Sequence, residues 1–176
     1  MLTPPLRASA AAVPIPVHDE SAATGILAPN QEAELRAAAL ALDAGERLCV
    51  VATDTLIVPP RVIAAANERI ESELGVPVSH QLICATHTHH APGTIDFLGC
   101  RPDEAFCDRL GEAIVEAARR ACAGLEEPGA EAELLFAQSQ EATVGGNSRY
   151  LLRDGTIAWR SYRWEDVIRP TGPHDV

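Results

Sequence analysis

The sequence predicts an α/β fold: a central mixed sheet that contains a parallel strand–helix–strand unit, with two main helices and flanking β-hairpins. Three observations lead to this prediction. Two short apolar runs, 48–52 and 78–85, have the length of buried strands. A stretch with helical spacing of apolar residues lies between them. Hydrophobic residues make up 47% of the chain but aromatic residues only 4%, and small side chains let helices pack closely onto a sheet.

A β-hairpin is predicted in the first third of the chain. Residues 1–34 are rich in Pro and Ala and are expected to be irregular, apart from a short strand at Ala8–Val13. The apolar runs 35–43 and 47–54 flank Ala44-Gly45-Glu46, and a Gly in a short connection of this kind is typical of a hairpin. Leu48–Ala52 is apolar on both faces, which predicts a central strand.

The parallel unit comes next. Pro59-Pro60 suits the first turn of a helix, and helical spacing begins at Arg61. Gly75 is predicted to cap the C-terminus of this helix. The apolar face of the helix is predicted to consist of Ile63, Ala66, Ile70 and Leu74. Val78–Ala85 then forms a second buried strand, and the helical crossover predicts that it runs parallel to the first, with a right-handed connection.

A second helix and further strands complete the predicted metal-site domain, which we place at residues 35–168. Asp103 is the expected N-cap of this helix and Gly124 ends it. Its apolar stripe is predicted to be Phe106, Leu110, Ala113, Ile114 and Ala117. Ala132–Gln138 is a third strand candidate, and the runs 150–152 and 156–159 flank an Asp-Gly turn, which predicts a second hairpin. Residues 169–176 show no regular pattern and are expected to form an exit segment.

Charge and cysteine content exclude several classes of function. The net charge is −11 and every basic residue is Arg, so nucleic acid and electrostatic membrane binding are not expected. No apolar run approaches the roughly 20 residues needed to span a bilayer, and prolines interrupt any signal peptide. The five cysteines are odd in number and form no C-x-x-C pair. We therefore expect reduced thiols in a cytoplasmic protein.

Two polar segments follow the strands of the parallel unit. Asp54 comes directly after the first strand, and Thr86-His87-Thr88-His89-His90 comes directly after the second. Ligands of open α/β sheets gather beyond the carboxyl ends of parallel strands. If the crossover is parallel, Asp54 and His87 emerge at the same edge of the sheet and can approach each other.

The spacing of the histidines indicates a metal site. In an extended segment alternate side chains project to one side, so His87 and His89 can point into one pocket while His90 points away. Zinc binds imidazole nitrogen readily, and a catalytic zinc site uses about three protein ligands and a water. Pro92-Gly93 turns the chain directly afterwards, which can bring backbone amides to the same pocket. The alternative is a His-rich surface loop without a metal.

Three further residues are weaker candidates. Asp54 either caps the loop before the Pro59 helix or supports a histidine of the site. Asn147 and Arg149 follow Gly145-Gly146, where the chain forms either a simple turn or a loop that brings a guanidinium to an oxyanion. The sequence contains no G-x-S-x-G elbow, P-loop or dinucleotide-binding fingerprint.

Several motifs together resemble the N-terminal part of the neutral/alkaline non-lysosomal ceramidase family. In chain order they are LRAAALALD, VVATD, ICATHTHHAPG, GGNSRY, LLRDGTIAW and RPTGPHDV, and they extend over most of residues 35–176. The most specific of them corresponds to the family motif T-H-T-H-x-x-P-G.

The resemblance implies a zinc-dependent hydrolase that cleaves the N-acyl bond of ceramide or of another lipid-like amide. It makes His87 the first zinc ligand, and it places His89 beside the metal to hydrogen-bond the substrate carbonyl or the developing oxyanion. The family's N-R segment falls on Asn147 to Arg149, with Ser148 where the family has its Arg, and Arg149 is the candidate for the oxyanion contact. His90 replaces a Ser of the family and is a candidate extra ligand.

The rest of the family's site has no counterpart in these 176 residues. The family's second His, Glu and Tyr at the zinc, and its Gly-Asp-x-Ser segment, lie beyond the matching part. The resemblance therefore implies an incomplete metal site, in a fragment, in half of a split protein, or in a degenerate relative. A complementary C-terminal chain or a homo-oligomer is the expected partner.

Two alternatives belong to other classes. A metallo-β-lactamase-like hydrolase also has H-x-H after a strand, but it needs H-x-H-x-D-H, and Ala91-Pro92 do not fit. The other alternative is a non-catalytic domain that binds a partner.

Overall fold

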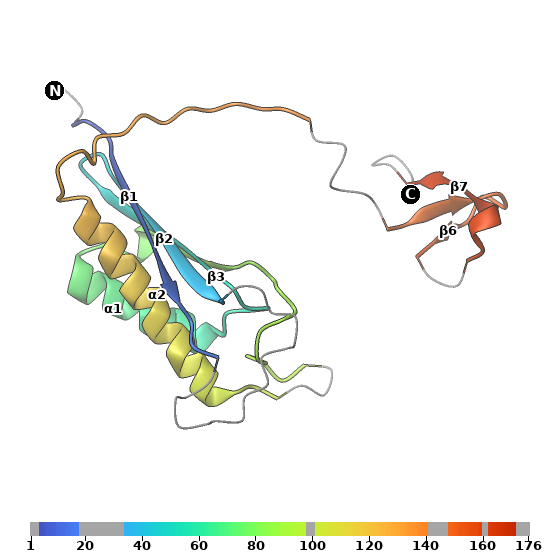
Figure 1. Cartoon of the computed structure of the whole chain (residues 1–176), viewed down its shortest axis with the longest axis horizontal. Coiled ribbons are helices and arrows are strands. Elements are labelled where there is room, and N and C mark those ends of the chain that lie inside the picture. The colour runs from blue at the N-terminus through green and yellow to red at the C-terminus, as the bar shows by residue number, and fades with distance from the viewer. Residues whose placement is uncertain (1–3, 18–33, 98–100, 141–147, 160–161, 172–176) are drawn as a thin grey trace. The chain divides into compact units, whose positions relative to one another are not determined.

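The computed structural model describes residues 4–17, 34–97, 101–140, 148–159 and 162–171 (Figure 1). The contacts within the chain divide it into two compact units, Met1–Glu133 and Leu134–Val176. The first unit holds a four-stranded sheet and two helices, and the second holds a small three-stranded sheet. The α/β class predicted from the sequence is confirmed.

The sheet of the first unit has the strand order β1-β2-β3-β4. Its strands are β1 (Arg7–Pro14), β2 (Arg36–Asp43), β3 (Arg47–Thr53) and β4 (Gln81–Ala85). The pairs β1–β2 and β2–β3 are antiparallel, and β3–β4 is parallel, so the predicted mixed sheet is confirmed. The β2–β3 hairpin turns at Gly45, whose φ of 99° favours glycine, and the Gly45 amide donates to the Asp43 carboxylate.

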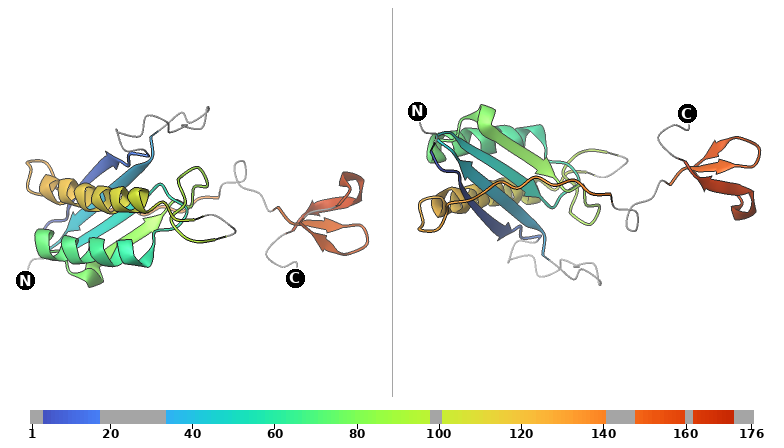
Figure 2. Two further views of the ribbon diagram at one scale, coloured as in Figure 1. Left: turned by 90° about the horizontal axis from the view of Figure 1, so that it is seen from below. Right: turned by 90° about the horizontal axis from the view of Figure 1, so that it is seen from above.

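Two helices cover one face of this sheet (Figure 2). Helix α1 (Pro60–Leu74) begins with a proline, which needs no hydrogen-bond partner for its nitrogen in the first turn. It ends at Gly75, which has a φ of 68° and donates its amide to the Glu71 carbonyl. Helix α2 (Glu104–Gly124) is capped by Asp103, whose carboxylate accepts from the Phe106 amide at 2.9 Å. These caps confirm the predicted helix ends.

Helix α2 supplies most of the core. All five residues of its predicted apolar stripe are buried, and Phe106, Leu110 and Ile114 are among the largest fully buried side chains. In α1 the prediction holds for Ala66 and Ile70. Ile63 and Leu74 are half-buried and pack against the same core, and Val62, which α1 turns toward α2, is fully buried in addition. Of the cysteines that the structure describes, three lie buried in this core as free thiols: Cys49, Cys107 and Cys122.

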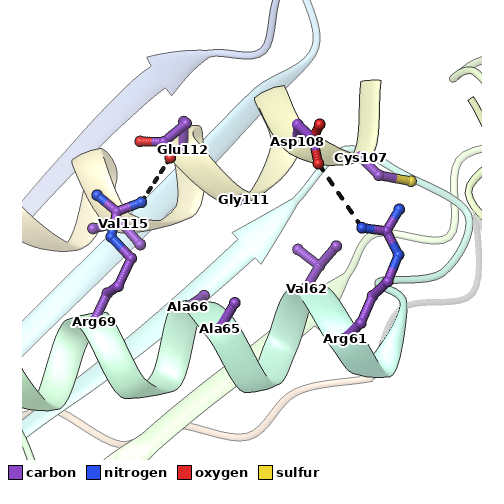
Figure 3. A pocket seen from close by; sticks show the side chains of 10 residues that line it. All are labelled: Arg61, Val62, Ala65, Ala66, Arg69, Cys107, Asp108, Gly111, Glu112 and Val115. Atoms are coloured by element: carbon purple, nitrogen blue, oxygen red, sulfur yellow. Dashed lines mark hydrogen bonds and ion pairs between the residues drawn. The ribbon is translucent and has the colours of Figure 1, made fainter. Parts of the chain in front are cut away.

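The two helices approach each other closely at Gly111 (Figure 3). A methyl group added there would lie 3.6 Å from Val62 Cγ1, which is ordinary contact. Ion pairs bridge the helices on either side, from Arg69 to Glu112 at 2.7 Å and from Arg61 to Asp108 at 3.8 Å. These pairs are exposed, so packing between the helices contributes more to stability than their charges do.

Strand β4 is shorter and more exposed than the sequence predicted. Val78–His80 forms a 3₁₀ turn after Pro77, so the strand begins only at Gln81. The expectation of a buried strand is wrong for one of its faces, because β4 lies at the sheet edge and Leu82 is 57% exposed. The helices cover the other face only.

The stretch Ala132–Gln138, a predicted strand, contains none. The Ala132 amide still donates to the Leu6 carbonyl beside the start of β1, but pairing stops there. Each residue further along would need a partner that precedes Leu6 in the chain, where β1 has not yet begun. Leu134, Leu135 and Phe136 are consequently 80–93% exposed.

The second unit is a small antiparallel sheet with the order β6-β5-β7. Its strands are β5 (Tyr150–Leu152), β6 (Ile157–Ala158) and β7 (Val167–Pro170). The predicted hairpin is confirmed, and Gly155 turns it with a φ of 84°. The expectation of an irregular 169–176 is wrong for Arg169 and Pro170, which belong to β7 and pair with β5. A short-range sequence pattern does not show this pairing, since β7 follows a 3₁₀ turn at Trp164–Asp166.

None of the helices in the described ranges is long and apolar enough to cross a membrane.

Two glycines of α2 offer a matched test of the packing. A side chain at Gly124 would lie 3.0 Å from Ser9 Cβ, so we expect Gly124→Ala to lower the free energy of unfolding by about 1–3 kcal/mol through overpacking. Gly111→Ala has room beside Val62 and should raise it by about 0.5–1 kcal/mol, because alanine favours the helix. Urea denaturation of both variants measures these values. Equal effects of the same sign would contradict the close contact of α2 with β1.

Candidate metal centre

The parallel pairing of β3 and β4 brings the two polar segments to one edge of the sheet. Thr53 is in register with Ala85, so both strands end at the same level. Beyond them the Thr86 amide donates to the Thr53 carbonyl at 2.9 Å, and the His87 amide donates to the Thr55 carbonyl at 3.1 Å. The prediction that Asp54 and the histidine segment emerge together is therefore confirmed.

Asp54 connects the histidine segment to the hairpin. Its Oδ1 accepts from the Thr86 hydroxyl at 3.2 Å, and its Oδ2 accepts from the Arg36 amide at 2.9 Å. Its contact with the Arg36 amide fits a cap of the loop after β3, and its contact with the Thr86 hydroxyl fits support of the residue next to His87. Both predicted roles of Asp54 therefore stay predictions.

His87 has an unusual backbone and a fixed ring. Its φ of 64° is the only positive value among the described non-glycine residues. This conformation is costly for a residue with a Cβ and is often found at functional sites. The ring Nδ1 lies 2.9 Å from the Leu56 carbonyl oxygen. Since a carbonyl only accepts, Nδ1 carries the proton, and Nε2 keeps a free lone pair for a ligand.

His89 lies beside His87. The centroids of the two rings are 5.3 Å apart and their planes are nearly perpendicular, at 86°. Both side chains are exposed, as is His90, whose amide donates to the Thr88 hydroxyl at 3.3 Å. The two rings lie close together, and their orientation into a common pocket stays a prediction. Because the backbone of His87 is left-handed, the alternation of side chains along an extended strand does not explain this closeness.

The chain is fixed again at the end of the histidine loop, through the adjacent residues Gly93 and Thr94. The buried Thr94 donates its hydroxyl to the Ile57 carbonyl at 2.7 Å, and the Gly93 carbonyl accepts the Asp103 amide at 2.7 Å. The histidine loop is thus tied to the segment after β3 and to the start of α2. Thr86 is recognisable in the sequence as part of the T-H-T-H motif, whereas the roles of Thr94 and of the Leu56 carbonyl follow from no short-range pattern.

The side chains fit zinc in kind but not in number. Imidazole nitrogen is a good zinc ligand, and Nε2 is the nitrogen of His87 that the contact with Leu56 leaves available. However, the described residues contain no group of three or more His, Cys, Asp or Glu side chains that could hold a metal ion. Two imidazoles fall short of the roughly three protein ligands of a catalytic zinc site.

The remaining predicted residues, Asn147 and Arg149, do not belong to the first unit. Asn147 is outside the described residues. Arg149 belongs to the second unit, where its guanidinium carbon lies 5.6 Å from the centroid of the Trp159 ring and its carbonyl accepts from Thr171. Its part in oxyanion binding stays a prediction.

Solved structures with a similar fold are ceramidases. A ceramidase described as complexed with C2 matches with a TM-score of 0.56 and 23% identity, over 68% of this chain and 21% of its own. Neutral ceramidase from Pseudomonas aeruginosa matches with a TM-score of 0.55 and 23% identity, over 68% of this chain and 22% of its own. This chain thus spans about a fifth of their length. No protein-family model and no curated protein matches the chain. At this level of identity the likeness establishes a ceramidase-like fold.

The backbone at His87 can be tested by stability alone. We expect His87→Gly to be more stable than His87→Ala by about 1 kcal/mol, because glycine adopts a positive φ without a steric cost. Both variants lose the contact to Leu56, so that loss cancels. At His89, where φ is not positive, alanine should be the more stable of the two. Chemical denaturation measures the free energy of unfolding of the four variants. If glycine were more stable than alanine at both positions, or less stable at both, the left-handed conformation of His87 would be refuted.

Proposed function

We propose that this chain is the N-terminal portion of a ceramidase-like, zinc-dependent amide hydrolase whose metal site is incomplete within the chain. One observation carries the proposal. His87, with its Nδ1 fixed on the Leu56 carbonyl, and His89, 5.3 Å away, lie at the carboxyl edge of a parallel strand pair in a ceramidase-like fold.

Each residue has a distinct role in this proposal. His87 would hold the metal through Nε2, and His90 is an additional candidate ligand. A bound zinc would polarise the substrate carbonyl and acidify a water molecule. His89 hydrogen-bonds the carbonyl oxygen as negative charge develops on it, and Arg149 is a candidate for the same task. Asp54 positions the segment through Thr86, and Asn147 belongs to the supporting residues.

The proposed substrate is a lipid-like amide, the class to which the ceramide of the matching enzymes belongs. The second candidate function is a non-catalytic domain that binds a partner, and the two-imidazole site favours it. A metallo-β-lactamase-like site is disfavoured, since Ala91-Pro92 occupy positions where that motif needs Asp and His.

Zinc binding separates the two candidates. In a titration of the chain with zinc chloride, followed by NMR of its six histidine rings, we expect the signals of His87 and His89 to shift first. The affinity should be far below that of a complete zinc site, because ligands are missing. His87→Gln should weaken binding at least tenfold, as loss of even a supporting residue does at zinc sites.

His80→Gln is the matched control, because His80 lies in the 3₁₀ turn before β4, beside Glu46, whereas the histidine loop follows the other end of that strand. It should leave the affinity unchanged. Shifts spread evenly over all six rings, or equal losses in both variants, would exclude the proposed metal centre and leave the binding domain.

A further inference from the structure

Two of the buried cysteines lie against each other between the sheet and helix α2. Cys49 is on β3 and Cys122 is in the last turn of α2, and they are 1% and 4% exposed. Their thiols are close enough to hydrogen-bond to each other. The end of α2 packs closely on the sheet here, since a methyl group at Gly124 would lie 3.0 Å from Ser9 Cβ. A disulfide requires such closeness, because its two Cβ atoms lie only about 4 Å apart.

Only one of these two thiols lines a pocket that opens to solvent. Cys122 lines a pocket of about 230 Å³, and Cys49 does not. The other residues of this pocket are Leu74, Ala123 and four charged residues, Arg47, Glu73, Arg119 and Glu126. A pocket of this size admits a molecule as small as hydrogen peroxide but excludes a peptide disulfide such as oxidised glutathione. A small oxidant therefore meets Cys122 first.

The surroundings of the pair make Cys122 the more reactive thiol. Its pKa is lowered, chiefly because the Cys49 thiol donates a hydrogen bond to its sulfur, and further because the Arg47 guanidinium lies nearby. Arg47 is itself held by Asp43 at 3.3 Å and by Glu126 at 2.7 Å. The pKa of the Cys49 thiol is raised, because Cys122 accepts its proton in that hydrogen bond and because Cys49 is buried. Since the thiolate is the nucleophilic form, the pair has an attacking sulfur in Cys122 and a resolving sulfur in Cys49.

Cys107, the other buried cysteine of α2, has a similar pocket but a different partner. Its pocket of about 210 Å³ also contains an arginine, Arg61. The Cys107 sulfur, however, contacts the Thr94 carbonyl at 3.9 Å instead of a second sulfur, and burial raises the pKa of its thiol. A pocket and a nearby arginine thus do not activate a buried thiol of this helix. The second sulfur makes the difference.

We propose that Cys49 and Cys122 are a peroxide-sensitive thiol pair that forms a reversible disulfide between β3 and α2. The Cys122 thiolate attacks one oxygen of hydrogen peroxide, the O–O bond breaks, and a sulfenic acid forms. The departing hydroxide takes up the proton that Cys122 released and becomes water. The Cys49 sulfur then attacks the sulfenic sulfur, the S–O bond breaks, and the hydroxide leaves with the Cys49 proton as a second water. The two thiols lose two electrons, and one peroxide is reduced to two waters.

The disulfide would enclose the part of the chain that carries the candidate metal centre. Residues 50–121 lie between the two cysteines, and they include α1, β4 and the histidine loop. A cross-link over so long a segment restricts the unfolded chain and thereby stabilises the folded one. Oxidation would thus strengthen the connection between β3 and α2 without a change at the histidines. The proposal does not depend on the proposed enzyme function.

Peptide mapping of the full chain after treatment with hydrogen peroxide tests the proposal. Free thiols are blocked with N-ethylmaleimide in denaturant, and the chain is cleaved with trypsin. Cleavage after arginine places Cys49 in the peptide 48–61, Cys122 in 121–149 and the other three cysteines in 70–109. We expect 48–61 and 121–149 to be linked, with a mass two hydrogens below their sum, and dithiothreitol to separate them.

Two further readouts report the order of the steps and the effect on stability. Cys122 should lose its thiol roughly tenfold or more faster than Cys107, because more of it is thiolate at neutral pH. The oxidised chain should melt about 5–15 °C higher than the reduced chain. In Cys49→Ala, which lacks the resolving sulfur, Cys122 should stop at the sulfenic acid, and dimedone should trap it there.

Cys107→Ala is the matched control, since it removes a buried thiol of the same helix and should leave the linked peptides unchanged. Loss of the Cys122 thiol no faster than that of Cys107 would overturn the proposal. Absence of the linked peptides after both thiols have been consumed would overturn it as well. So would equally rapid linkage in urea, because the contact in the folded chain would then contribute nothing.

Discussion

The parallel pairing of β3 with β4 is the constraint on which the candidate site depends. Because Thr53 and Ala85 end in register, the residues after each strand must share one small region. The backbone ladder continues past the strands through Thr86 and His87. Because the two segments are close, Asp54 can accept from the Thr86 hydroxyl and the His87 ring can contact the Leu56 carbonyl. An antiparallel β4 would carry its histidines to the opposite end of the sheet.

The β3–β4 pairing in turn depends on a hydrophobic core that lies on one face of the sheet only. Helix α2 buries ten of its residues against the sheet and α1, and small residues such as Ala37, Ala41 and Ala117 keep the layers close. The helices bury one face and leave the other apolar but open. This asymmetry explains why β4, at the edge of the sheet, has an exposed face despite its apolar sequence.

Local patterns in the sequence predicted the elements that local interactions determine. The hairpin at Gly45, the cap at Asp103 and the end of α1 at Gly75 each follow from a short motif, and the structure agrees. The failures involve partners distant in sequence. Leu134–Phe136 has the composition of a strand but no neighbour to pair with, and Arg169 pairs with Leu151 across 18 residues. For the site, the sequence predicted the nearness of His87 and His89 but not the left-handed turn that produces it.

The left-handed backbone of His87 has an evolutionary consequence. A residue held in a disfavoured backbone conformation lowers stability, and substitution by glycine, or to a lesser degree by asparagine, would relieve this cost. A domain that is no longer selected for chemistry gains nothing from keeping a histidine in this destabilising backbone conformation. Drift toward glycine or asparagine at position 87 among relatives would therefore mark a lineage in which the imidazole had become dispensable, whereas retention of histidine would mark one in which it still performs a task.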